Sequence, residues 1–192
     1  MNSHTNAACI RITSVWQDHC EVHWQSEEER NSGAVTVTEG DDDFVHITFN
    51  DSKQLQPEQK TKIDLRVPEM VNIYMRGINI DLEMKNKIQG DLSVETQRGS
   101  IVLDKVRGQF IDLQIGEATL NVKKVIEASA LNIQCSKLDA KMINGDLIDV
   151  HCSKGIQVGA MYSKEARLVS CQGITLRGLH GNVQVSKLFI PR

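Results

Sequence analysis

The sequence has few aromatic residues, no strong charge of either sign and no long apolar run. Phe, Trp and Tyr make up 4% of the 192 residues, which disfavours base-stacking grooves and the aromatic platforms that hold sugar rings. The formal net charge of −3 provides no basic face for a nucleic-acid backbone. Apolar runs span only a few residues, far short of the roughly 20 that a transmembrane helix needs. We therefore expect neither a nucleic-acid partner nor a transmembrane segment.

Targeting and catalytic signatures are also missing. Residues 1–8 are short and polar, without the charged and apolar regions of a signal peptide or the Arg-rich pattern of a presequence. The five cysteines are odd in number and form no CxxC pair, so free thiols are expected rather than a disulfide framework. No GxSxG nucleophile motif or phosphate-cradling loop is found. These features predict an intracellular protein that is not an enzyme and has no cofactor.

The sequence does contain an internal repeat of about 18 residues. Three apolar slots recur in each repeat, and the residue between the first two slots is polar in four of five repeats, which is the alternation of a strand. The first slot holds Ile101, Leu120, Leu138, Ile156 and Ile174; the second holds Leu103, Val122, Ala140, Val158 and Leu176; the third holds Val106, Val125, Ile143, Met161 and Leu179.

A corner is expected two residues after the third slot. Glycine, which is favoured at sharp turns, stands there in most repeats, the column being Gly90, Gly108, Glu127, Gly145, Ser163 and Gly181. A second short strand follows each corner, near residues 92–94, 111–115, 131–133, 148–150 and 168–170. Its register drifts by a residue or two between repeats, and bulges would absorb the drift.

The repeat predicts an all-β fold, a single-stranded β-solenoid with coils of about 18 residues. Helices fit poorly because alternation runs for only four to six residues before a turn. An antiparallel sandwich would have no reason to repeat the same three slots at a constant spacing, whereas stacked coils must place like side chains above one another. Residues 1–60 lack the repeat and are predicted to form an N-terminal β cap, with the solenoid domain over residues 61–192.

The C-terminal coil is expected to be open. Residues 181–185 have the pattern of a new coil, and no polar capping segment follows before Arg192. An uncovered coil exposes backbone donors and acceptors that favour strand addition. We therefore expect a protein partner or self-association through this end.

Several segments resemble the putative-adhesin domain family. The resemblance covers about residues 60 to 185, in which a strand ending at Pro68 leads into coils of the form glycine, strand, polar turn, glycine, strand. It is carried by Leu65-Arg66-Val67-Pro68, Val71-Asn72-Ile73, Gly77, Gly90-Asp91-Leu92-Ser93-Val94 and Gly99-Ser100-Ile101-Val102-Leu103. The sequence is most similar to the animal branch called family with sequence similarity 185 member A, through Val94-Glu95-Thr96, Val106-Arg107-Gly108-Gln109 and His180-Gly181-Asn182-Val183. The resemblance implies a β-solenoid without catalytic residues, in the cytoplasm or in mitochondria.

Three cysteines are spaced by about one coil. Cys135, Cys152 and Cys171 lie 17 and 19 residues apart and are expected to form a stacked column. Such a column could hold a soft metal ion or act in redox chemistry. The alternative, which we favour, is that cysteine is a small apolar filler of a narrow interior, as Thr96 and Ile115 are in earlier coils. No metal site is therefore assigned.

Other candidate sites are weaker. His19 and His23 fall on one face of a strand and Cys20 on the other, which favours surface residues over a metal site. The acidic run 41–43 lacks calcium-loop spacing. Outward carboxylates on the coils could serve glycoside chemistry, as in some β-helix proteins, and the candidates are Asp112, Asp139 and Asp149.

The leading functional hypothesis is a non-enzymatic scaffold, a rigid rod whose faces or C-terminal end bind another protein. A glycan-binding or glycan-processing protein is the first alternative, and a thiol column with a metal or redox role is the second.

Overall fold

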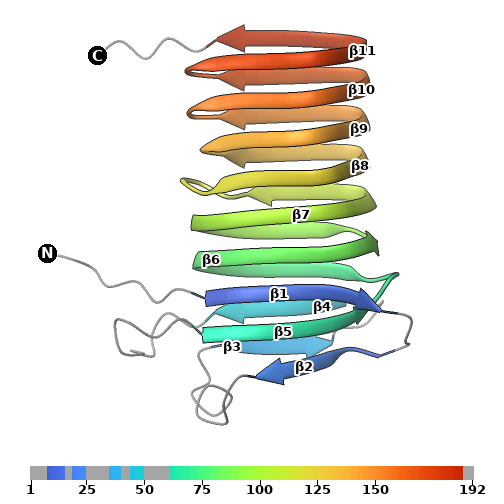
Figure 1. The fold of residues 1–192 in the computed structure, drawn as a ribbon, viewed down its shortest axis with the longest axis vertical. Helices are drawn as coiled ribbons and strands as arrows, with labels where there is room; N and C mark the ends of the chain where they lie inside the picture. The colour runs from blue at the N-terminus through green and yellow to red at the C-terminus, as the bar shows by residue number, and fades with distance from the viewer. Residues whose placement is uncertain (1–7, 16–18, 25–34, 40–43, 50–60, 188–192) are drawn as a thin grey trace, which may run out of the picture.

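Alternating side chains give every coil a buried side and an outward side. In strand β9 (Lys137–Cys152), for example, Leu138 and Ala140 are buried while Asp139 between them is exposed. The computed structural model describes residues 8–15, 19–24, 35–39, 44–49 and 61–187, and these ranges contain strands but no helix. Stacked parallel coils of about 18 residues form a β-solenoid, which confirms the predicted fold class (Figure 1).

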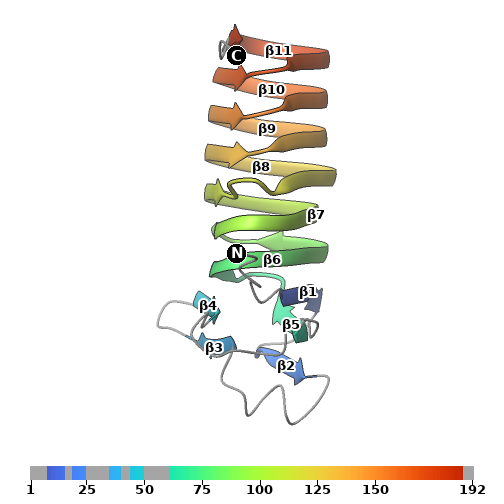
Figure 2. The ribbon, with the colours of Figure 1, turned by 90° about the vertical axis from the view of Figure 1, so that its left-hand side faces the viewer.

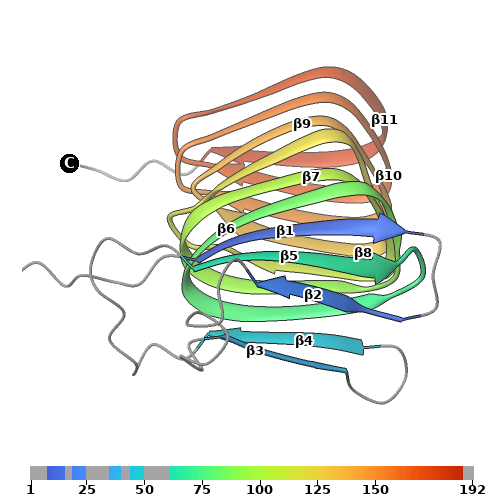
Figure 3. The same cartoon turned by 60° about the horizontal axis from the view of Figure 1, so that its bottom comes forward.

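Each long strand bends around the stack and contributes to two broad faces (Figure 3). The six long strands are β6 (Asn72–Gln89), β7 (Leu92–Gln114), β8 (Thr119–Cys135), β9, β10 (Gly155–Ser170) and β11 (Gly173–Lys187). Each pairs in parallel with the next, in the order β11-β10-β9-β8-β7-β6. The first two apolar slots lie on one broad face, and the second short strand of each coil lies on the other.

The predicted columns form in the first two slots. Ile101 pairs with Leu120, and the column continues through Leu138 and Ile156 to Ile174. The second slot is equally regular, from Leu103 to Leu176. Both columns are therefore confirmed residue by residue.

The prediction for the third slot is wrong in one coil. Val106 pairs with Ile126, and Ile126 with Ile143, so Ile126 occupies the place predicted for Val125. The glycine corner shifts with it, because Gly108 and Gly145 both pair with Ala128 rather than Glu127. The cause is a register irregularity between Val122 and Ile126, where β8 carries an extra residue. That bulge inverts which of the next two side chains points inward.

The N-terminal strands are built into the same sheet system. They are β1 (Ala8–Val15), β2 (Glu21–Trp24), β3 (Val35–Glu39), β4 (Phe44–Phe49) and β5 (Thr61–Pro68). Strand β1 lies between β5 and β6 and is parallel to both, while β4 is parallel to β6 on the other face (Figure 2). The outermost described strands, β2 and β3, are antiparallel to β5 and β4.

One apolar core runs through all these strands. Ile10 of β1 pairs with Ile63 of β5 and Leu82 of β6, which extends the first-slot column into the N-terminal region. All three side chains are fully buried in the same cluster as the coil residues. In the part of the chain that the structure describes, nothing forms a helix of the length and apolarity that crossing a membrane requires.

Candidate functional site

The outward side of the second short strands carries three parallel columns of residues. Every second residue of a strand points outward, and the in-register stacking of β7 to β10 aligns these residues between coils. We call this surface the outer grid. Its columns are Phe110-Ala130-Leu147-Glu165, Asp112-Asn132-Asp149-Arg167 and Gln114-Gln134-His151-Val169.

Hydrogen bonds connect polar members of the grid. Asp112 Oδ1 accepts bonds from Gln114 Nε2 and Asn132 Nδ2, each at 2.9 Å. One coil further, His151 Nε2 lies 3.0 Å from Asp149 Oδ1. The Gln114 and His151 contacts join neighbouring columns, and the Asn132 bond joins neighbouring coils within one column, so the side chains are held in place by their partners as well as by the rigid backbone.

A surface hollow of about 620 Å³ lies over the first two columns. Phe110 and Leu147 are 60% and 56% exposed, and the smaller Ala130 stands between them in the same column. Charged residues border the hollow, among them Glu165 and Arg167. The hollow therefore combines two exposed apolar side chains with a polar rim.

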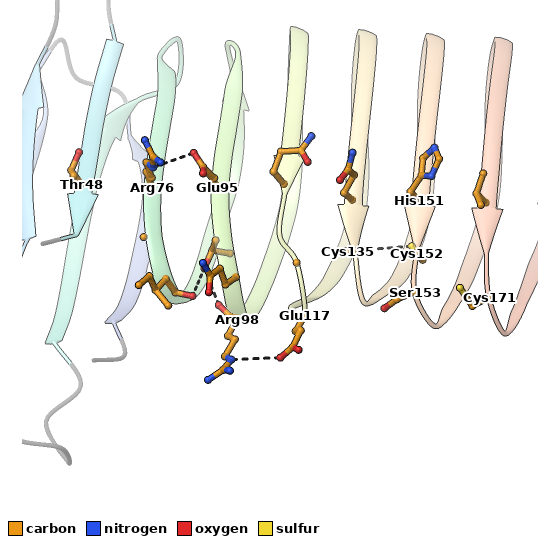
Figure 4. Close-up of a pocket in the computed structure, with 18 residues that line it drawn as sticks. Thr48, Arg76, Glu95, Arg98, Glu117, Cys135, His151, Cys152, Ser153 and Cys171 are labelled. Atoms are coloured by element: carbon orange, nitrogen blue, oxygen red, sulfur yellow. Dashed lines mark hydrogen bonds and ion pairs between the residues drawn. The ribbon is translucent and has the colours of Figure 1, made fainter. Parts of the chain in front are cut away.

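A longer groove of about 1060 Å³ follows the third column across several coils (Figure 4). Its lining runs from Thr48 on β4 to the buried Val169 on β10 and includes residues of the corners. Ion pairs bridge neighbouring coils along it, Arg76 with Glu95 at 3.2 Å and Arg98 with Glu117 at 3.5 Å. We call it the axial groove.

Two of the three predicted column cysteines meet beside this groove. Cys135 and Cys152 pair in register on β8 and β9, their sulfurs are 3.2 Å apart, and each is 4% exposed. The hydrogen bond with Cys152, together with burial, raises the pKa of the Cys135 thiol above its ordinary value. Cys135 is therefore a protonated thiol at neutral pH.

The predicted three-thiol column is wrong at Cys171. Ser170, not Cys171, is in register with Cys152, because this coil takes 18 residues and Cys171 comes one position later. Cys171 is half-buried and lies past the end of β10. Within the described ranges, no three His, Cys, Asp or Glu side chains are grouped so that they could hold a metal ion.

The remaining predicted site residues are dispersed. Asp112 and Asp149 share one column of the outer grid, whereas Asp139 pairs with Asn121 and Gln157 on the other broad face. His19 and His23 both contact the Glu21 carboxylate, at 3.4 and 3.2 Å, but only His23 lies on a strand, because β2 begins at Glu21. The acidic run 41–43 lies outside the described residues.

Sequence reasoning missed the two exposed apolar residues of the grid. Phe110 stands directly before the buried Ile111, and Leu147 directly before the buried Ile148. An apolar residue next to an inward one on a short strand is a usable signal, because it must point outward. The drifting register of the second strand concealed it.

Comparison with known proteins gives one structural likeness. No family model matches this sequence, and no curated protein matches it significantly. Among solved structures, a crystal structure described as a putative adhesin from Bacteroides fragilis NCTC 9343 is similar over 96% of this chain and 89% of its own. The two sequences are 14% identical, and the TM-score is 0.42.

Proposed function

We propose that the protein is a non-enzymatic scaffold that binds another protein through its outer grid. The observation that carries this proposal is the exposure of Phe110 and Leu147 on a rigid sheet face, with charged residues around them. Protein interfaces concentrate their binding energy in a few apolar or aromatic residues surrounded by a polar rim. A preorganised sheet also loses little conformational entropy on binding.

The test is a quantitative pull-down from native extract with matched variants. The double variant Phe110→Ser with Leu147→Ser removes the apolar centre, and Gln157→Ser on the other broad face is the control. We expect the control to recover the same protein as the wild type and the double variant to lose it at least tenfold. Both grid side chains are exposed, so stability should change by no more than about 0.5 kcal/mol each. Equal recovery of the partner protein by both variants would exclude the outer grid as the binding surface.

A second surface for a partner is the edge of β11. Among the described strands β11 pairs only with β10, and Leu179 and Val185 are 44% and 55% exposed. Strand addition by a partner or a second copy would cover them. Size-exclusion chromatography with light scattering tests self-association, since Val185→Lys should shift any oligomer toward monomer. A concentration-independent monomer for the wild type would exclude it.

The glycan hypothesis has one specific observation in its favour. Asp112 and Asp149 lie in one column two coils apart, a separation of roughly 9–10 Å from the strand spacing, near the upper limit for inverting glycosidases. Against it, amide donors engage Asp112 Oδ1, and among the described residues that line the hollow only Phe110 is aromatic. Glycan-array binding that Asp112→Asn abolishes would favour this alternative over the scaffold.

The cellular location is a proposal of the same kind. We place the protein inside the cell, in the cytoplasm or in mitochondria, as the resemblance to the animal branch called family with sequence similarity 185 member A implies. Fractionation with compartment markers tests the location. Recovery only from the secreted fraction would contradict it.

A further inference from the structure

We propose that Cys135 and Cys152 are an oxidation site, at which a small-molecule disulfide such as oxidised glutathione converts the two thiols into a disulfide that joins β8 to β9. The proposal is independent of the partner-binding function, because neither cysteine belongs to the outer grid.

The backbone already has the separation that a disulfide needs. Cys135 and Cys152 are direct register partners on neighbouring parallel strands, whose backbones lie about 4.8 Å apart. This value falls within the range of about 4.4–6.8 Å between the Cα atoms of disulfide-bonded cysteines. The sulfurs are already in contact at 3.2 Å. Small side-chain rotations can therefore close the bond while the two coils stay in place.

The register also selects one pair among the five cysteines. Above and below the pair, Ser170 is the register partner of Cys152, and Ile115 donates its backbone N–H to Gln134, next to Cys135. Neither neighbour offers a competing sulfur. Cys171 is out of register, Cys9 lies on β1, and Cys20 directly precedes β2. No other described cysteine has the same alignment with either member of the pair.

Packing alone does not require sulfur at these positions. Thr96 and Ser170 occupy the same inward corner position in other coils and are equally buried. Hydroxyl groups there find backbone partners, since Thr96 Oγ1 donates to the carbonyl of Ile78 or of Arg98. A serine in place of either cysteine should therefore be tolerated, which makes serine variants suitable for the test.

The axial groove provides the route for the reagent. Both cysteines belong to its lining, with the half-buried Cys171 at the same end (Figure 4). Because the two sulfurs are nearly covered, the reagent must wait for a local opening of the corner. We therefore expect oxidation over hours rather than seconds.

The reaction is a two-step thiol–disulfide exchange. One cysteine loses its proton to solvent, and its sulfur attacks oxidised glutathione, forming a mixed disulfide and releasing one glutathione thiolate. The second cysteine, also deprotonated, attacks the protein sulfur of the mixed disulfide and releases the other glutathione thiolate. Both thiolates take up the two protons, so two protein thiols are oxidised as one glutathione disulfide is reduced to two glutathiones.

The experiment uses the full chain with Cys9, Cys20 and Cys171 each changed to serine, which leaves only the pair. After incubation with oxidised glutathione, we expect denatured-state thiol titration to fall from two thiols to none. Intact mass should fall by about two hydrogens, and peptide mapping should link Cys135 to Cys152. The closed loop spans 17 residues, so Tm should rise by roughly 5–10 °C and return after reduction.

The control carries the further change Cys135→Ser and should show no rise in Tm. Two retained thiols in the paired variant, or two added glutathiones without a link, would overturn the proposal. The wild-type protein is mapped in parallel, and a link from Cys152 to Cys171 instead of Cys135 would also overturn it.

Discussion

The central coils and the last described coil, β11, carry the same apolar slots but bury them to different extents. Leu103 and Leu138 are fully buried, whereas Ile174 and Leu176, in the same columns of β11, are only partly buried. The central residues have a described coil on both sides, and β11 has one. This difference indicates that each coil receives half of its core from its neighbours. Stability should therefore be spread along the stack as a sum of contributions from adjacent coils.

Shortening a leucine of the second slot should show this difference between the central coils and β11 most clearly. Leu103→Ala removes a fully buried side chain from a central coil and should cost about 2–5 kcal/mol of unfolding free energy. Leu176→Ala, in the same column, should cost less than half as much because its side chain is already partly exposed. Urea unfolding with fitted m-values measures both. Equal losses of unfolding free energy would contradict the idea that neighbouring coils supply half of each coil's core.

Two glycines, one in a central strand and one at the start of β11, allow the backbone packing of the two regions to be compared. Gly99 in β7 has φ +125°, and an added Cβ would lie 1.9 Å from the carbonyl oxygen of Ile80. Gly99→Ala should therefore destabilise by about 2–3 kcal/mol through strain and overpacking. Gly173, at the start of β11, has open space around its Cβ position, so Gly173→Ala should be within about 0.5 kcal/mol of neutral. Thermal unfolding distinguishes the two variants. Similar Tm values would contradict a need for glycine at position 99.

Hydrogen exchange compares the coils without substitutions. Amides of β8 and β9, which are paired on both sides, should exchange only through larger openings. Those of β11 should exchange at least tenfold faster, since the last coil can detach alone. Mass spectrometry of deuterium uptake resolves the two regions. Uniform protection from β7 to β11 would mean that a further contact covers the last coil.

The smallest effect is expected from an ion pair in the first coil. Lys87 Nζ lies 2.6 Å from Glu69 Oε1, and this contact lowers the pKa of the Glu69 carboxyl below its ordinary value. A lowered pKa in the folded state contributes stability above the ordinary carboxyl pKa, and that stability is lost as pH falls through the lowered value. Glu69→Gln should therefore reduce the loss of Tm between about pH 5 and pH 3. The solvent exposure of the pair keeps the effect small. An unchanged dependence of Tm on pH would show that the ion pair does not contribute to stability.

The sequence alone was sufficient for the coil and for two of its columns. Apolar residues at constant spacing on alternating strands have one arrangement that buries them all, so the spacing by itself aligns the column from Ile101 to Ile174. Ile126 could not be assigned in the same way. Val125 and Ile126 are both apolar and adjacent, and only the bulge before them decides which one points inward.

The candidate sites depended more on the tertiary structure. Spacings of 17 and 19 residues average one coil, which suggested three aligned thiols, but pairing is decided coil by coil and places Ser170 beside Cys152. Phe110 and Leu147 are 37 residues apart in the chain and share a hollow only because two coils bring them into one column.

The sequence by itself determined the all-β solenoid, its coil length and the inward residues of the first strand, because hydrophobic periodicity constrains what can be buried. Only the tertiary structure decided the register at bulges, the place of β1 between β5 and β6, the contact of Cys135 with Cys152 and the outer grid. A shift of one residue on a strand reverses every side chain, and local spacing does not specify such a shift.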